Sequence, residues 1–220
     1  MMRIGVLALQ GDFVEHEAAQ RRLGVDTHQV RRPQDLSGLD ALVIPGGEST
    51  TLCRLMIEFE LQEPLKRLIA GRLPVWGTCA GLILLAKRAR DLPYPTLDAL
   101  DISVRRNAYG RQLDSFEADI DVPALGQLSR NGGKQRASSP APFHAVFIRA
   151  PVVDGIGDGV EVLAQLSPIE AGPRGGSVVA VRQDNLLATT FHPELTGDSR
   201  FHRYFLEIVQ AHTGRRSSAK

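Results

Sequence analysis

Short apolar runs alternate with helical stretches over the first 90 residues of the chain. The apolar runs suit strands that are covered on both faces, and they lie at residues 3–9, 25–30, 40–45 and from residue 74 onward. A helix is expected from Asp12 to about Leu23, because Asp12 and Glu15 resemble a capping box. Helical patterning also covers about residues 50–70, where Pro64 marks a new first turn. The alternation predicts a three-layer α/β/α fold around a mostly parallel sheet.

The second half of the chain is richer in strands and turns. Six strand candidates occur, at residues 102–106, 112–122, 144–150, 160–166, 177–182 and 186–191. A final helix carries one apolar stripe, formed by Phe201, Tyr204, Phe205, Ile208 and Val209. Residues 123–142 are rich in Gly, Ser, Pro and basic residues and lack apolar periodicity, so we expect a flexible surface loop. We expect a single domain over residues 1–212 and a disordered tail at 213–220.

The composition is that of a water-soluble globular protein. Of the 220 residues, 43% are hydrophobic and 23% are charged, and the net charge is +1. This balance gives no reason to expect nucleic acid or an anionic membrane as a partner. The N-terminal apolar run is too short for a signal peptide, and no stretch approaches the ~20 apolar residues of a membrane span.

The two cysteines, Cys53 and Cys79, cannot build a disulfide framework, which favours a reducing cytoplasm. Most histidines lack ligand spacing with Cys, Asp or Glu, so we expect no metal site; these are His16, His28, His144, His202 and His212. Cys53 and Trp76 are expected to be packed in the core.

One stretch, Gly77-Thr78-Cys79-Ala80-Gly81, joins an apolar run to an apolar helical segment. This pattern is the cysteine counterpart of a nucleophile elbow, in which flanking glycines admit strained backbone angles and close packing of strand and helix. A cysteine at the first turn of a helix lies beside unpaired N–H groups, which favour the thiolate. Cys79 is therefore a candidate nucleophile. The alternative for an isolated cysteine is a small buried apolar side chain.

A candidate base and its carboxylate partner follow the last strand candidate. His192 and Glu194 are two residues apart, so in an extended segment they project to the same side, and the carboxylate can hold an imidazole nitrogen. The alternative is a surface pair at a strand end. Gly46 and Gly47 follow an earlier strand and can present an N–H group to the same crevice, unless they form only a tight turn. The N–H of Ala80 is the other expected oxyanion donor.

Nucleophile, base and orienting carboxylate are the parts of a cysteine triad. The stretches that carry them resemble the three signatures of class I, or triad, glutamine amidotransferases: Pro45-Gly46-Gly47-Glu48-Ser49-Thr50, Gly77-Thr78-Cys79-Ala80-Gly81 and Phe191-His192-Pro193-Glu194. Together with Leu9-Gln10-Gly11, residues 106–117 and residues 146–151, they are similar to the glutaminase subunit of pyridoxal 5′-phosphate synthase, the PdxT (Pdx2) family. The resemblance covers about residues 3–210 and implies a flavodoxin-like class I amidotransferase fold.

The resemblance implies a role for each matched residue. Cys79 would attack the side-chain amide of L-glutamine, His192 would shuttle protons, and Glu194 would orient His192. The backbone of Gly47 and Ala80 would hold the oxyanion. Glutamine would be bound by Gly47, Glu48, Ser49, Arg106, Ile148 and Arg149. Arginine suits this task in kind, because its planar fork matches an α-carboxylate.

The resemblance also implies a partner and no cofactor. The family's glutaminase docks on a (β/α)8-barrel synthase subunit, PdxS (Pdx1), and passes ammonia to it for vitamin B6 synthesis without release to solvent. We therefore expect the chain alone to be weakly active or silent. Two alternatives stay open. One is a glutaminase for another ammonia-using synthase, which the Gly-Gly-Glu-Ser-Thr and Ile-Arg-Ala-Pro stretches disfavour. The other is a non-catalytic scaffold of the same fold, which the intact triad disfavours.

Overall fold

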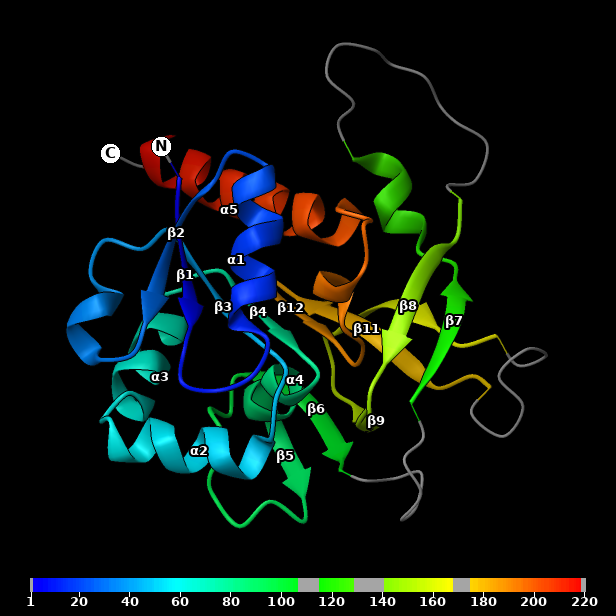
Figure 1. The fold of residues 1–220 in the computed structure, drawn as a ribbon, viewed down its shortest axis with the longest axis horizontal. Helices are drawn as coiled ribbons and strands as arrows, with labels where there is room; N and C mark the ends of the chain where they lie inside the picture. The colour runs from blue at the N-terminus through cyan, green and yellow to red at the C-terminus, as the bar shows by residue number, and fades with distance from the viewer. Residues whose placement is uncertain (1, 107–114, 129–140, 168–174, 219–220) are drawn as a thin grey trace.

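A seven-stranded sheet forms the centre of the computed structural model, which describes residues 2–106, 115–128, 141–167 and 175–218. Its strands are β1 (Arg3–Leu7), β2 (Asp26–Val30), β3 (Ala41–Ile44), β4 (Val75–Thr78), β10 (Glu161–Gln165), β11 (Val178–Gln183) and β12 (Leu186–Thr189), and their spatial order is β10-β11-β12-β4-β3-β1-β2 (Figure 1). β12, β4, β3, β1 and β2 run parallel, whereas β11 is antiparallel to both of its neighbours. The predicted α/β fold with a mostly parallel sheet is confirmed.

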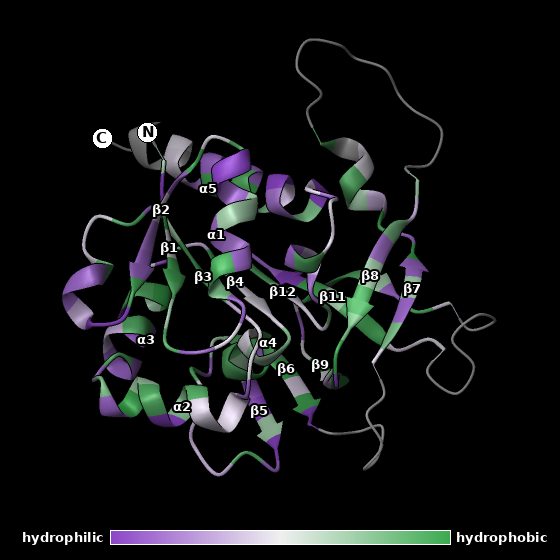
Figure 2. Ribbon diagram, viewed as in Figure 1, coloured by the Kyte–Doolittle hydropathy of each residue, from purple (hydrophilic) through white to green (hydrophobic). Residues whose placement is uncertain are grey.

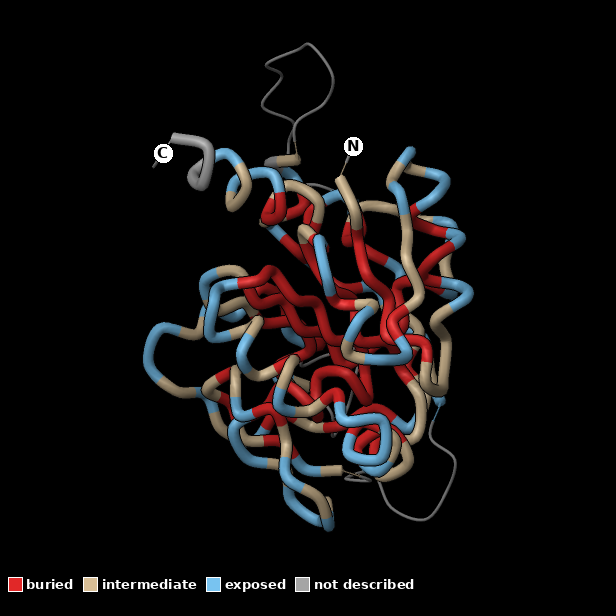
Figure 3. Tube along the Cα trace, turned by 90° about the vertical axis from the view of Figure 1, so that its left-hand side faces the viewer, coloured by how far each residue is buried: buried red, intermediate tan, exposed pale blue. Residues whose placement is uncertain are grey.

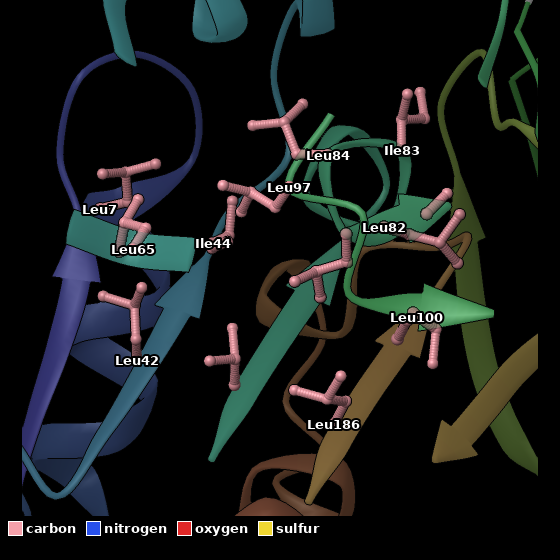
Figure 4. Close-up of a cluster of buried hydrophobic side chains, with 14 of the residues drawn as sticks. Leu7, Leu42, Ile44, Leu65, Leu82, Ile83, Leu84, Leu97, Leu100 and Leu186 are labelled. Atoms are coloured by element: carbon pink, nitrogen blue, oxygen red, sulfur yellow. The ribbon is translucent and has the colours of Figure 1, made fainter. Parts of the chain in front are cut away.

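The α-helices of the described residues cover both faces of this sheet. They are α1 (Phe13–Arg22), α2 (Ser49–Glu58), α3 (Gln62–Ala70), α4 (Ala80–Leu85) and α5 (Arg200–Ser218). Successive side chains of a strand point to opposite faces, so each buried strand supplies two cores. Leu42 of β3 packs in the core formed with Leu65 of α3 and Leu82 of α4 (Figure 4). Val43 packs on the opposite face, in the core that contains Phe201 of α5.

The burial pattern follows from this layering. Figure 3 shows the buried segments gathered in the centre of the molecule and the exposed ones around it. Trp76 and Cys53 are both fully buried, which confirms that they are core residues. Strand β2 lies at the edge of the sheet and is largely hydrophilic (Figure 2), a composition that discourages pairing with another chain.

Two smaller sheets lie beside the central one. One contains β5 (Ala86–Arg90), β6 (Leu100–Arg105) and β9 (Val152–Ile156), and the other pairs β7 (Phe116–Ile120) with β8 (Phe143–Phe147). Phe147 at the end of β8 stacks on Phe116, with ring centroids 4.4 Å apart, and meets the ring of Phe191 edge-on at 5.6 Å. This packing brings the segment after β8 next to the segment after β12.

Three details of the sequence interpretation were wrong. β5 and β9 were not expected, because both are short and neither alternates cleanly between apolar buried and polar exposed residues. Lys87 of β5, for example, pairs with Asp101 of β6 at 3.2 Å. The capping box of Asp12 and Glu15 does not form. Asp12 makes no side-chain cap hydrogen bond, since its carboxylate Oδ2 lies 3.2 Å from Nδ1 of His192 instead.

Two segments expected to be irregular are partly helical. Residues 123–127, within the expected loop 123–142, form the 3₁₀ helix η2 (Pro123–Gln127), which Pro123 starts and in which Leu125 is buried. Residues 129–140 lie outside the described residues. Helix α5 continues to Ser218, through most of the expected tail 213–220, and the Thr213 hydroxyl donates to the carbonyl of Val209 inside it. Two further 3₁₀ turns are η1 (Pro33–Leu36) and η4 (Pro193–Leu195).

Candidate active site

Three turns meet at the carboxyl end of the parallel strands. Gly46 and Gly47 follow β3, Cys79 follows β4, and His192 lies three residues after the end of β12. Because β4 pairs with both β3 and β12, the three turns come from adjacent strands. Open parallel sheets bind their ligands at this end. The crevice expected from the sequence therefore lies at the ends of three strands that are neighbours in the sheet.

Cys79 occupies a strained turn between β4 and α4. Its φ of 48° lies in the left-handed region, and its backbone N–H donates to the carbonyl of Thr189 at 2.8 Å, which ties the turn to β12. A side-chain carbon on Gly77 would lie 2.5 Å from the backbone of Gly81, and one on Gly81 would overlap the carbonyl oxygen of Ile44. Strand and helix can approach this closely only because both positions are glycine, as a nucleophile elbow requires.

His192 and Glu194 form a buried hydrogen bond. Nδ1 of His192 lies 2.8 Å from Oε1 of Glu194, and the two residues are 3% and 5% exposed, so they are no surface pair. The extended geometry expected for this segment was wrong, because Glu194 lies in η4, and this helical turn brings its carboxylate back to His192. The N–H of His192 donates to the carbonyl of Val146 at 2.9 Å, which fixes the segment against β8.

The charges around His192 favour its protonated form. Burial lowers the pKa of His192, but hydrogen bonds with three side chains, those of Asp12, Cys79 and Glu194, raise it overall. Burial raises the pKa of Glu194, but His16 and His192 hold it well below its usual range. The imidazole can therefore take a proton from a neighbouring thiol and remain stable as a cation.

Gly46 and Gly47 expose bare backbone to the crevice. A side chain on Gly46 would overlap the imidazole of His192. One on Gly47, whose φ is 152°, would lie 2.6 Å from Oε1 of Gln10, the atom that accepts a hydrogen bond from the N–H of Glu48 at 2.8 Å. A glycine pair that only formed a tight turn would not face such neighbours. Glycine is required at both positions because the His192 ring and the Gln10 side chain leave no room for a larger residue.

These groups surround a pocket of about 300 Å³. Cys79 and His192 line it together with all the predicted binding residues, namely Gly47, Glu48, Ser49, Arg106, Ile148 and Arg149. Residues that were not predicted also line it: Gln10, Gly11, Asp12, Ile83 and Pro151. Ala80 and Glu194 are buried and do not line the pocket. Cys79 is only 6% exposed, but it lines this pocket, whereas a cysteine that served only as a small packing residue would have no reason to lie there.

Arg106 reaches the pocket already engaged with its neighbours. Its Nη2 lies 3.2 Å from Oε1 of Glu48 and donates to the hydroxyl of Thr50 at 2.9 Å. Burial raises the pKa of Glu48, but hydrogen bonds from Thr50 and Thr51 at the start of α2 lower it to about 2. Glu48 is thus a fixed anion that, together with the carbonyl of Asp91, which accepts from Nη1 at 2.8 Å, holds the guanidinium at the pocket wall.

Ile148 and Arg149 enter the pocket from the end of β8. The carbonyl oxygen of Ile148 lies 3.9 Å from Sγ of Cys79, so the segment borders the sulfur directly. Arg149 has a φ of 45°, an unusual value for a residue other than glycine, which marks a sharp turn in the chain at this point. The pocket therefore carries two cationic side chains, from Arg106 and Arg149, close to a cysteine and a histidine.

Comparisons with known proteins agree with this geometry. The family model described as the SNO glutamine amidotransferase family matches residues 6–211. The chain belongs to this glutamine amidotransferase family. It is 52% identical over 210 residues to the pyridoxal 5′-phosphate synthase subunit PdxT of Herpetosiphon aurantiacus, covering 94% of this chain and 100% of that one. It is 52% identical over 206 residues to the subunit of the same name from Pelotomaculum thermopropionicum, with 94% of each chain covered.

The fold of this amidotransferase also matches a solved structure. A crystal structure of a glutamine amidotransferase superposes with a TM-score of 0.79 at 46% sequence identity, covering 94% of this chain and 98% of that one. Over the described residues, no helix is long and apolar enough to cross a membrane.

The amidotransferase site contains two polar residues that the sequence interpretation did not assign. Asp12 is a second carboxylate at Nδ1 of His192, and His16 lies fully buried with Nε2 3.2 Å from Oε2 of Glu194. In the sequence, the stretch Leu9-Gln10-Gly11 next to Asp12 pointed to a functional site only through the family resemblance. Asp12, His192 and Glu194 are close enough in space to hold a metal ion. However, Nδ1 of His192 points between two carboxylates, where a proton satisfies all three groups.

Proposed function

We propose that this amidotransferase hydrolyses L-glutamine to L-glutamate and ammonia through a Cys79-His192-Glu194 triad. The observation that carries the proposal is the meeting of three adjacent strand ends, which supply a thiol, an imidazole held by a buried carboxylate, and a bare glycine backbone in one pocket. Each component matches one requirement of acyl transfer by a cysteine.

The chemistry follows from the positions of these groups. His192 takes the thiol proton of Cys79, and the sulfur attacks the amide carbon of the glutamine side chain. The N–H groups of Gly47 and Ala80 hold the oxyanion of the tetrahedral intermediate. His192 returns the proton to the leaving nitrogen, the C–N bond breaks, and ammonia departs from a γ-glutamyl thioester. Water, deprotonated by His192, then attacks the thioester, which releases glutamate and restores the thiol.

Glutamine is held by residues that line the same pocket as Cys79 and His192. Arg106 and Arg149 supply the cationic contact for its α-carboxylate, because guanidinium groups bind carboxylates through two parallel hydrogen bonds. Gly47, Glu48, Ser49 and Ile148, which also line the pocket, supply backbone and polar contacts. No cofactor is needed for these steps.

The relatives are named as subunits of pyridoxal 5′-phosphate synthase, and for this chain we propose that the ammonia goes to the synthase subunit of such an enzyme. We propose a PdxS (Pdx1) barrel as the partner in a cytoplasmic hetero-oligomer. A protected transfer has a physical reason, because ammonia protonates in water at neutral pH and is then no longer a nucleophile.

The test measures glutamate release from glutamine with and without the barrel subunit. Wild type should need the partner, and Cys79→Ala should be inactive in both conditions, whereas Cys53→Ala, which changes the other buried thiol, should behave as wild type. High turnover by the chain alone would contradict the dependence on a partner. Activation by a different ammonia-using synthase, but not by the barrel, would assign another acceptor. A scaffold would show no labelling of Cys79 by a glutamine-like alkylating agent in the complex.

A further inference from the structure

A buried polar cluster lies directly behind the triad. It comprises His16 of α1, Thr78 of β4, Glu194 of η4 and His202 of α5, and each of these residues is at most 5% exposed. We refer to it as the His16 cluster. Residues of a hydrophobic core that carry a charge or a ring nitrogen need polar partners, because an unpaired polar group loses its hydration on burial.

Within the cluster, His16 is the residue that meets the carboxylate of the triad. Its Nε2 lies 3.2 Å from Oε2 of Glu194 and 3.1 Å from Oγ1 of Thr78. A bare Nε2 lone pair would face a carboxylate oxygen at 3.2 Å, which is repulsive, so the arrangement requires a proton on Nε2. The N–H group is aligned with Thr78, and Oε2 has no hydrogen bond of good geometry to any described residue.

The two oxygens of Glu194 therefore have separate partners. Oε1 binds His192 at 2.8 Å, and Oε2 lies 3.2 Å from Nε2 of His16. We propose that His16 is a positioning residue of the triad: its Nε2–H group donates to Thr78 and presents its positive edge to the outer oxygen of Glu194 at 3.2 Å, which stabilises that carboxylate and so fixes the imidazole that serves Cys79. This inference rests on the proposed function, since it takes Cys79, His192 and Glu194 as the triad.

The other charged groups near Glu194 do not replace His16. His192 occupies the opposite oxygen, with Asp12 on its other side. Burial, followed by repulsion from His16, lowers the pKa of His202 to about 3, so that ring is neutral at physiological pH. Arg22 and Asp198 interact electrostatically with His202, and Glu17 on the same helix as His16 pairs with Arg21.

His202 supplies a matched control for packing. It is as buried as His16, its ring lies 4.9 Å from that of Trp76, and the ring of His16 lies 5.4 Å from the same indole. No hydrogen bond or ion pair within the described residues joins His202 to Glu194. A substitution at His202 therefore disturbs the same aromatic cluster, including the ring contact with His16 at 5.5 Å, without removing the group that faces the carboxylate.

The experiment compares His16→Met, His16→Gln and His202→Met by the pH dependence of Cys79 alkylation with iodoacetamide. The chain is used alone, and the modified Cys79 peptide is quantified by mass spectrometry. Glutaminase activity is then measured with the synthase subunit. Gln places an amide N–H near the position of Nε2, whereas Met is of similar length and has no donor.

We expect His16→Met to shift the acid limb of Cys79 alkylation to higher pH. The reason is that Glu194 becomes protonated at higher pH and supports the imidazolium less. We also expect about a 10-fold or greater loss of kcat at nearly unchanged KM, comparable to the loss when a residue that orients a metal ligand is replaced. His16→Gln should recover most of both losses, and His202→Met should match the wild-type pH profile.

A wild-type profile in His16→Met, or equal shifts in His16→Met and His202→Met, would overturn the proposal. If His16→Met does not fold, His16→Asn carries the same comparison with His16→Gln, because its amide is one methylene short of Glu194. Alkylation of Cys79 requires neither glutamine nor the partner. A shift in alkylation without glutamine hydrolysis by wild type would therefore refute the proposed function and leave the contact with Glu194 supported.

Discussion

Replacing Glu194 with Gln removes one negative charge from the triad and almost no volume. In the structure Oε1 of Glu194 lies 2.8 Å from Nδ1 of His192, and the carboxylate is fully shielded from solvent. Two opposite charges about 4 Å apart attract by about 4 kcal/mol at an effective dielectric constant of ~20. The imidazolium that forms as Cys79 attacks would lose this stabilisation, which corresponds to about a 1,000-fold loss of rate.

Asp12 limits the size of that loss. Its carboxylate lies 3.2 Å from the same Nδ1 and is 36% exposed, so it partly replaces Glu194 but is screened by solvent. We therefore expect Glu194→Gln to lower kcat about 100- to 1,000-fold. Asp12→Asn should lower it only about 5-fold, in line with ~1 kcal/mol for a partly exposed pair. The double variant should lose more than the product of the single losses.

The assay is steady-state glutamate release by the complex with the synthase subunit, from pH 5.5 to 9. Thermal unfolding of each variant is measured in parallel, and Glu15→Gln on the exposed side of α1 serves as the control. Wild-type kcat in Glu194→Gln at every pH would refute the orienting role. Equal losses in Asp12→Asn and Glu194→Gln would refute the argument from burial.

Three further outcomes follow from the structure. Arg106→Gln should raise KM for glutamine about 10-fold or more, since a hydrogen bond to a charged group contributes about 1.5–3 kcal/mol, whereas the exposed Arg105→Gln should leave KM unchanged. Gly46→Ala should abolish most glutaminase activity, because the new methyl group would overlap the His192 ring, and Gly197→Ala, which has open space around it, should not. His144 lies between two carboxylates of β7, which raise its pKa. Its contribution to stability is therefore present at low pH and is lost as the pH rises through that raised pKa. The difference in melting temperature between wild type and His144→Gln should be larger at pH 5 than at pH 8.

The sequence allowed the fold to be predicted where local pattern and tertiary structure agree. The strands at residues 3–9 and 40–45 are buried on both faces, so their apolar runs stand out, and β1 and β3 lie within them. β5 has the sequence Ala-Lys-Arg-Ala-Arg, which carries no strand pattern, because its charged residues are exposed on both faces and only Ala86 is fully buried. Its pairing with β6 depends on the tertiary structure alone.

The residues of the site also divide into those with a local sequence pattern and those that depend on long-range contacts. Cys79, Gly77 and Gly81 could be found from sequence because the elbow is a local structure with fixed spacing. The contact between His192 and Glu194 was expected for the wrong reason, since a 3₁₀ turn, and not an extended strand, closes it. Asp12 and His16 were missed because they contact residues about 180 positions later in the chain. Nothing in a local pattern reports such contacts.

During turnover, Cys79 is expected to carry the γ-glutamyl group. The most direct measurement is rapid acid quenching of the complex with glutamine, followed by peptide mass spectrometry. We predict a γ-glutamyl mass increase on the Cys79 peptide of wild type, and neither this adduct nor glutamate release in Cys79→Ala. Acylation of a different residue, or glutamate release by Cys79→Ala at the wild-type rate, would contradict the account.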